Sequence, residues 1–229
     1  MTIGIIGAMD EEIAFLKDAM YIKKELEVAN CLFIEGQLYD KEVVLLQSGI
    51  GKVNAAMATT ILHERFAPNY IINTGSAGGF ATDLEIGDVV ISTQVVHHDV
   101  DATAFDYAYG QVPQMPAMYD ADVNLVAKVV NVLTDLDISY KKGIIATGDS
   151  FMSDGKHVTF VREKFPTMIA AEMEAAAIAQ VCYQYATPFV IIRALSDIAG
   201  KESSVSFDAF LKTAATNAAN IIIKFIQST

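Results

Sequence analysis

Short apolar runs alternate with helical segments along nearly the whole chain, and this alternation constrains the fold more than any other feature. Residues 2–7 (TIGIIG) form an apolar run that ends in glycine, which is typical of a buried strand. Residues 9–20 follow with acids in the first turn and apolar side chains at helical spacing, which predicts a helix. Strands that alternate with helices predict an α/β fold, with a mainly parallel sheet and helices on both of its faces.

The remaining segments continue this pattern, and we interpret residues 1–229 as a single domain. Residues 31–49 hold two β runs around a YDKE turn, so we expect a hairpin and therefore a mixed sheet. Further strands are expected at 69–75, 87–96, 141–148, 167–171 and 187–197, and further helices at 51–66, 120–136, 157–165, 175–182 and 207–225. The stretch from His97 to about Met118 has no regular pattern.

The charge and apolar content of the chain exclude several classes of partner. A net charge of −12, with only Arg65, Arg162 and Arg193 as arginines, leaves no basic track for nucleic acid. Hydrophobic residues make up 52% of the chain, yet no run of about 18 apolar residues predicts a membrane span. The N-terminus meets acidic residues at once, unlike a signal peptide. We therefore expect a cytoplasmic protein that acts on small molecules and buries apolar surface in an oligomer interface.

Ligands bind at the carboxyl ends of strands in such sheets, so the residues at those ends are the first candidates for a site. After the first expected strand, the helix dipole accounts for Asp10 and Glu11 but does not single out Glu12, which stays a catalytic candidate. At the next strand end, Ser76 stands in the glycine-rich stretch NTGSAGG. The spacing there matches neither a dinucleotide fingerprint nor a nucleophile elbow. A tight turn and a ligand cradle both stay open as interpretations of this stretch.

The segment HHDVD is a candidate metal centre. His97, Asp99 and Asp101 would share one side of an extended segment, and these residue types ligate metals in hydrolases. No second cluster of His and Asp of similar density completes such a site. A hydrogen-bonded loop is the alternative interpretation.

Four charged residues interrupt stretches that otherwise have the composition of a protein core. Arg193 and Asp197 lie in the strand FVIIRALSD, and a buried guanidinium needs carboxylate partners. Glu172 and Glu174 lie at a strand-to-helix junction within AAEMEAAAIA, from which both can reach a site that contains Arg193. Such a desolvated, acidic pocket stabilises a developing cation and raises the pKa of a carboxyl enough to make it an acid. Cleavage of a glycosidic bond requires both properties.

Seven segments in this order, GIIGAMDEE, SGIGKVNAA, NTGSAGG, HDVDATAF, TGDSF, AAEMEAAAIA and RALSD, resemble the 5′-methylthioadenosine/S-adenosylhomocysteine nucleosidases. The match spans nearly the whole chain. It implies a three-layer α/β/α sandwich around a mixed β-sheet, as in nucleoside phosphorylases. It also implies an enzyme of methionine salvage and amino-acid biosynthesis. The expected reaction is hydrolysis of the N-glycosidic bond of 5′-methylthioadenosine and S-adenosylhomocysteine, with release of adenine and the 5′-thioribose.

The resemblance also implies roles for individual residues. Glu12 would activate the attacking water and Asp197 would protonate adenine at N7, while Glu174 would bind the ribose hydroxyls. Phe151 would stack on adenine, whose edge is read by the backbone of Met152, where a branched aliphatic residue is expected. The substrate-binding set implied by the family is Met9, Ile50, Ser76, Gly78, Phe151, Met152, Glu172, Met173, Glu174, Arg193 and Phe207.

The same resemblance implies a homodimer without metal or other cofactor. Phe105 and Pro113 would belong to a loop that lines the 5′ pocket of the partner subunit. Two alternatives stay open: a nucleoside phosphorylase on the same fold, and a non-catalytic nucleoside-binding module. The choice among 5′-methylthioadenosine, S-adenosylhomocysteine, 5′-deoxyadenosine and aminodeoxyfutalosine also stays open.

Overall fold

The structure, a computed structural model, describes residues 1–201 and 203–228. Its strands are β1 (Thr2–Gly7), β2 (Tyr21–Val28), β3 (Cys31–Leu38), β4 (Lys41–Gln47), β5 (Tyr70–Gly79), β6 (Val89–His97), β7 (Tyr119–Asp120), β8 (Tyr140–Thr147), β9 (Met168–Glu172) and β10 (Phe189–Ile198). Its helices are α1 (Asp10–Ala19), α2 (Lys52–Phe66), the short 3₁₀ helix η1 (Thr103–Phe105), α3 (Val123–Asp135), α4 (Gly155–Lys164), α5 (Ala175–Gln184) and α6 (Ser203–Ser228).

The sheet is mixed, and part of it closes on itself. Its strand order is β10-β6-β8-β9-β5-β1-β4-β3-β2, and β10 pairs with β5 as well as with β6. The strands β5, β10, β6, β8 and β9 therefore form a closed ring of pairings. The expected hairpin of β3 and β4 is present, and β1 runs parallel to β4 and β5. Antiparallel pairs are more frequent than the sequence indicated, but the predicted mixed sheet is confirmed.

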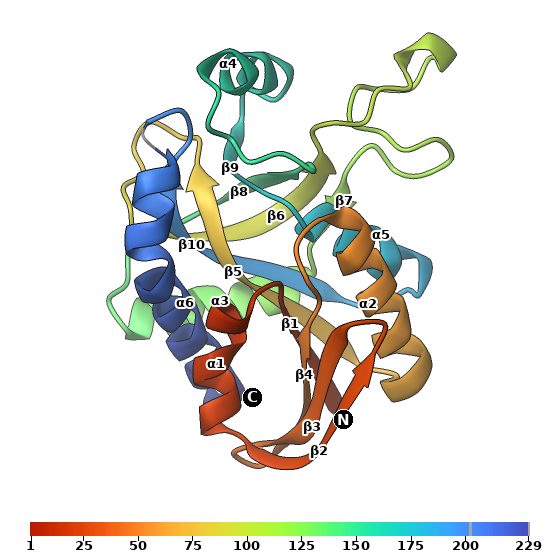
Figure 1. Cartoon of the computed structure of the whole chain (residues 1–229), viewed down its shortest axis with the longest axis vertical. Coiled ribbons are helices and arrows are strands. Elements are labelled where there is room, and N and C mark those ends of the chain that lie inside the picture. The colour runs from red at the N-terminus through yellow and green to blue at the C-terminus, as the bar shows by residue number, and fades with distance from the viewer. Residues whose placement is uncertain (202, 229) are drawn as a thin grey trace.

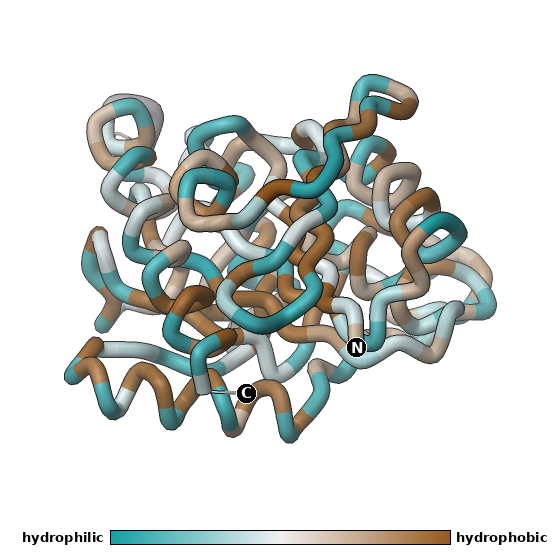
Figure 2. The backbone as a smooth tube through the Cα atoms, turned by 90° about the horizontal axis from the view of Figure 1, so that it is seen from below, coloured by the Kyte–Doolittle hydropathy of each residue, from teal (hydrophilic) through white to brown (hydrophobic). Residues whose placement is uncertain are grey.

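Helices cover both faces of the sheet, as Figure 1 shows: α1, α3 and α6 on one face, α2 and α5 on the other. Alternate residues of a strand pack against the helices on opposite faces of the sheet, because successive side chains point to opposite faces. Ile72 packs with the residues of α1, α3 and α6, whereas Ile71 packs with those of α2 and α5. The helix turns in Figure 2 correspondingly alternate between hydrophobic and hydrophilic residues. The α/β/α layering is thus the one expected.

Three strands differ from the sequence-based expectation. The two-residue strand β7 pairs with β6 where the irregular stretch was expected to lead directly into a helix. β2 was not predicted, because most of its side chains are exposed and no apolar alternation marks it. It is an edge strand rich in Lys and Glu, which is how natural proteins discourage edge-to-edge pairing. β5 was expected to end at Gly75 but continues to Gly79, because β10 pairs with it over that stretch. Ser76 therefore lies in a strand and not in a glycine-rich loop.

The irregular stretch between β6 and β7 projects from the body of the molecule (Figure 1). It carries η1, whose Phe105 is 78% exposed. The C-terminal helix α6 is 26 residues long, and it packs along the sheet through buried residues such as Phe225. Within the described residues, no helix has the length and apolar character to cross a membrane.

Candidate active site

The carboxyl ends of β1, β5, β9 and β10 meet at a pocket of about 360 Å³. Their convergence follows from the pairings of β5 with its neighbours β1, β9 and β10. The lining residues are Ala8, Met9, Glu12, Ile50, Ser76, Ala77, Gly78, Phe151, Ala171, Glu172, Met173, Glu174, Ser196, Asp197, Phe207 and Asp208. The pocket combines buried carboxylates with an apolar rim.

Glu12 is buried at the start of α1, and backbone N–H groups hold its carboxylate. Its Oε2 accepts hydrogen bonds from the N–H groups of Ala8 (2.8 Å) and Met9 (3.3 Å), which helps to cap the helix. Its Oε1 accepts from Ser76 through both the N–H (2.9 Å) and the Oγ hydroxyl (3.1 Å). Glu12 is thus a structural cap and a pocket carboxylate at once. Its orientation suits a group that takes a proton from a bound water.

Arg193 lies beneath the pocket and joins its three glutamates. The guanidinium is 1% exposed and pairs with Glu172, with Glu174 (3.4 Å) and, more distantly, with Glu12 (4.0 Å). The side-chain oxygen of Asn73 accepts a further bond from Nη2 at 2.8 Å. Burial alone would lower the pKa of Arg193, but the carboxylates outweigh burial and raise it. Arg193 therefore neutralises part of the acidic cluster from below and does not line the pocket.

Glu172, the last residue of β9, organises the junction that leads into α5. Its carboxylate accepts hydrogen bonds from the N–H groups of Glu174 (3.0 Å) and Ala175 (2.8 Å), and also from the hydroxyl of Thr147. That hydroxyl in turn accepts from the N–H of Ala176 at 2.8 Å. These contacts satisfy the free N–H groups at the start of α5. A carboxylate in this apolar stretch is thus explained by local capping together with the ion pair to Arg193.

The pKa of Glu174 is strongly perturbed by its surroundings. Its Oε1 accepts from the N–H of Gly51 at 2.9 Å, across the pocket from α5. Burial, followed by the negative charge of Glu172, raises the pKa of Glu174 to about 8, although Arg193 acts in the opposite direction. A carboxyl group that exchanges its proton near neutral pH is able to bind sugar hydroxyls as donor or acceptor.

This raised pKa predicts that Glu174→Gln gains stability relative to the wild type as pH rises. The pKa of Glu174 is about 8 when folded, against 4.5 for an ordinary glutamate. The folded state therefore holds a proton that the unfolded chain releases, and wild-type stability falls as pH rises through that window. The slope is at most about 1.4 kcal/mol per pH unit. Thermal unfolding of both proteins at pH 5.5 and pH 8 measures it. An unchanged difference in Tm between the two proteins would contradict the raised pKa.

Asp197 occupies the other end of the pocket, where β10 bulges against β5. The carboxyl is 2% exposed, and the hydroxyl of Ser196 donates to its Oδ1 at 2.9 Å. A side chain on Gly78 would come within 3.1 Å of Oδ2, so glycine leaves space for a ligand to approach Asp197. The carboxyl group therefore faces the pocket from a rigid strand, where it can donate a proton to a bound base.

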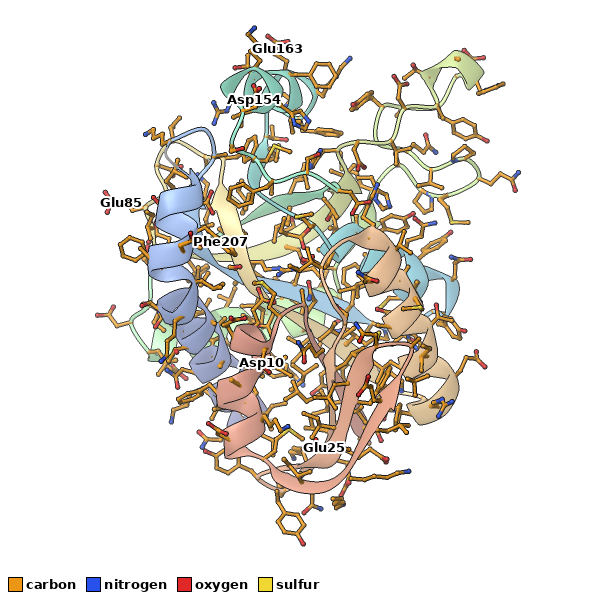
Figure 3. All side chains as sticks on the ribbon, in the orientation of Figure 1. Asp10, Glu25, Glu85, Asp154, Glu163 and Phe207 are labelled. Atoms are coloured by element: carbon orange, nitrogen blue, oxygen red, sulfur yellow. The ribbon has the colours of Figure 1, made fainter. Side chains whose placement is uncertain are left out.

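An apolar rim closes the pocket above the carboxylates. Phe151 and Phe207 meet edge to face, with ring centroids 5.7 Å apart. Figure 3 labels Phe207 on the N-terminal part of α6. Met9, Ile50 and Met173 also line the pocket. Aromatic and thioether side chains suit a flat base and an alkylthio substituent.

The structure brings most of the sequence-predicted site residues together. Among the predicted residues, four are not part of the main pocket wall in this chain, and one of them is Arg193, which lies beneath the pocket. Met152 lines a small adjoining cavity of about 30 Å³, and Phe105 and Pro113 lie on the projecting stretch. Sequence reasoning missed Ala8, Ala77, Ala171, Ser196 and Asp208. Each of these five residues adjoins a predicted residue in the sequence, and this adjacency is the signal that could have found them.

The segment HHDVD does not gather around one point. The Nε2 atom of His97 contacts Gln180 at 3.0 Å, while Asp99 accepts from Lys52 at 2.5 Å. Asp101 accepts from Thr103. His97, Asp99 and Asp101 thus each bind a different partner, so the hydrogen-bonded loop is the interpretation that the structure supports.

Comparison with known proteins identifies the family. The model of the phosphorylase superfamily matches residues 2–227. A 5′-methylthioadenosine/S-adenosylhomocysteine nucleosidase of Oceanobacillus iheyensis is 68% identical over 227 residues, which is 99% of each chain. The Neisseria meningitidis nucleosidase of the same name was solved with methylthio-immucillin-A. It superposes with a TM-score of 0.97 at 47% identity, covering 100% of this chain and 99% of that one.

The nucleosidase of Colwellia psychrerythraea, solved with adenine, superposes with a TM-score of 0.95 at 49% identity and covers 99% of this chain and 95% of that one. Sequence and fold thus agree on one group of proteins. The chain belongs to the phosphorylase superfamily and, within it, to the 5′-methylthioadenosine/S-adenosylhomocysteine nucleosidases.

Proposed function

We propose that the pocket between Glu12 and Asp197 is where this nucleosidase hydrolyses the N-glycosidic bond of 5′-methylthioadenosine and S-adenosylhomocysteine. The products are adenine and the 5′-thioribose. The observation that carries the proposal is a set of buried carboxylates: Glu12, Glu172 and Glu174 surround the buried Arg193, and Asp197 lies at the other end of the pocket. Such a site favours the cation-like ribosyl group that forms as the glycosidic bond breaks.

Asp197 acts as the general acid in this mechanism. Its carboxyl donates a proton to N7 of adenine, so that the base leaves as a neutral molecule when the bond from N9 to C1′ breaks. Ser196 orients the carboxyl through its hydroxyl at 2.9 Å. Phe151 packs against the face of the base, and the opening beside Gly78 admits its edge.

Glu12 acts as the general base. It takes one proton from a water molecule as the water oxygen bonds to C1′, and Ser76 helps to position that water. Glu174 binds the ribose hydroxyls. The apolar side chains of Met9, Ile50, Met173 and Phe207 accommodate the 5′-alkylthio group. General acid and general base each contribute about 10²–10⁴-fold to the rate.

Hydrolysis without phosphate distinguishes this function from the phosphorylase alternative. A phosphorylase binds a dianion beside C1′ with cationic side chains. None of the described pocket-lining residues is a lysine or arginine. Asn73 is buried, with its amide bonded to Ile6 and Arg193. Adenine release should therefore proceed at full rate in phosphate-free buffer and yield the free sugar. Stimulation by phosphate together with formation of a sugar 1-phosphate would overturn the assignment.

The working unit in this proposal is a homodimer. The stretch between β6 and β7 projects from the body with Phe105 and Pro113 exposed, and apolar surface of this kind is typical of an interface. These two residues would complete the 5′ end of the partner subunit's pocket. Light scattering should report twice the mass of the chain, and a fully active monomer would refute this. The single-domain organisation of residues 1–229 and the cytoplasmic location stay predictions.

A further inference from the structure

Lys52, Asp99 and Asp149 form a closed set of hydrogen bonds beside the pocket, which we call the loop clasp. The Nζ atom of Lys52 donates to Oδ1 of Asp99 at 2.5 Å. The other carboxylate oxygen of Asp99 accepts from the N–H of Asp149 at 3.0 Å. The circle closes where Oδ1 of Asp149 accepts from the N–H of Lys52 at 2.8 Å. The clasp thus ties the chain after β4, β6 and β8 together, and none of its three residues lines the pocket.

The Lys52–Asp99 pair of the clasp is more protected from solvent than the other lysine–carboxylate pairs described. The side chains of Lys52 and Asp99 are 20% and 25% exposed. Burial alone would raise the pKa of Asp99, but the bonds from Lys52 and Asp149 lower it. The carboxylate therefore stays charged, and charge-assisted hydrogen bonds are stronger than neutral ones.

Residues next to the clasp connect it to the pocket at two places. Gly51, next to Lys52, donates its N–H to Oε1 of Glu174 at 2.9 Å. A side chain on Gly51 would meet Oδ1 of Asp149 at 3.0 Å, and its φ of +94° favours glycine. On the other side, Phe151 follows Asp149 by two residues and faces Phe207 across the pocket.

We propose that the loop clasp is a positioning device for substrate binding. It holds the turn at residues 50–52 so that the Gly51 N–H reaches Glu174, and the turn at 149–151 so that Phe151 faces the base. The inference rests on the proposed function of the pocket. Glu12 and Asp197 are held by other contacts, from Ser76 and Ser196. Loss of the clasp should therefore weaken binding and spare the chemical step.

Steady-state kinetics of adenine release from 5′-methylthioadenosine test this in Lys52→Met and Asp99→Asn. Both variants should raise KM about fivefold to tenfold, the effect of losing one hydrogen bond of ordinary strength, with kcat within about threefold. Lys141→Met is the matched control, because Lys141 pairs with Asp83 at the same 2.5 Å outside the pocket. Its KM should equal that of the wild type.

Two further measurements separate positioning from general stability. The hydrogen bond from the Gly51 N–H lowers the pKa of Glu174. Lys52→Met should weaken this bond, so the part of the kcat/KM profile in which Glu174 titrates should move to higher pH. Calorimetric titration with adenine should show weaker binding in both clasp variants, even if turnover fails. Wild-type protein that releases no adenine would refute the proposed function alone. The positioning role of the clasp would be refuted if folded Lys52→Met kept the wild-type KM and the wild-type affinity for adenine. It would also be refuted if only kcat fell in that variant. Either result decides the question even if Asp99→Asn does not fold.

Discussion

Replacing Asp197 with asparagine should lower kcat at least about 100-fold while the protein stays folded. Asparagine keeps the shape of the side chain and still accepts the hydrogen bond from the Ser196 hydroxyl, which is 2.9 Å long in the wild type. It has no carboxyl proton to give to adenine, so the base would have to leave as an anion. Glu12→Gln should fall in the same range, because an amide cannot take a proton from water. Initial rates of adenine release at saturating substrate measure both effects.

Asp83→Asn is a suitable control for the aspartate change. Asp83 is an exposed residue paired with Lys141, outside the pocket, and its loss should leave kcat unchanged. Thermal unfolding confirms that each variant is folded before its rate is interpreted. A folded Asp197→Asn or Glu12→Gln enzyme with near-normal kcat would remove that residue from the mechanism.

Replacing Gly75 with alanine should disable the site and destabilise the fold together. The backbone at Gly75 has φ of +144°, which favours glycine. An added methyl group would lie 2.3 Å from Oε1 of Glu12 and 2.5 Å from Nη1 of Arg193. Overpacking and backbone strain each cost about 1–3 kcal/mol. We therefore expect a loss of about 3 kcal/mol and a fall in Tm of about 6–12 °C. Any folded fraction should have kcat reduced by an order of magnitude or more, because the added methyl displaces Glu12.

Gly155→Ala gives the comparison for this change. Gly155 is the first residue of α4, and a methyl group added there meets nothing within 4 Å. Its Tm should stay within a few degrees of the wild type, because alanine suits the helix. Differential scanning calorimetry of both variants decides the matter. A Gly75→Ala protein with wild-type Tm and kcat would mean that β5 and the acidic cluster have room to adjust.

Most helices and strands were predictable because their buried apolar residues recur at a regular spacing along the sequence. β1 begins and ends at the residues that the apolar run indicated, and α1 has its buried side chains at the expected spacing. β2 escaped detection because an exposed edge strand has no apolar face to record. Conversely, β5 was cut short at Gly75 because glycines usually mark a turn, whereas pairing with β10 keeps the chain extended. The limit here is physical, since strand pairing over long separations leaves no local pattern.

In the active site too, the sequence predicted the candidate residues, but long-range contacts decided how they are arranged. The charged residues in apolar stretches marked Glu172, Glu174, Arg193 and Asp197 as candidates before any coordinates, because an ion in a core needs a partner. Only the tertiary structure decided that Arg193 lies below the pocket. The loop clasp was equally invisible, because its three residues are 47 and 50 positions apart along the chain. Periodicity and composition therefore determined the elements and the candidate residues. Side-chain packing between distant segments decided which of those residues meet, because that packing depends on how the folded layers are placed against each other.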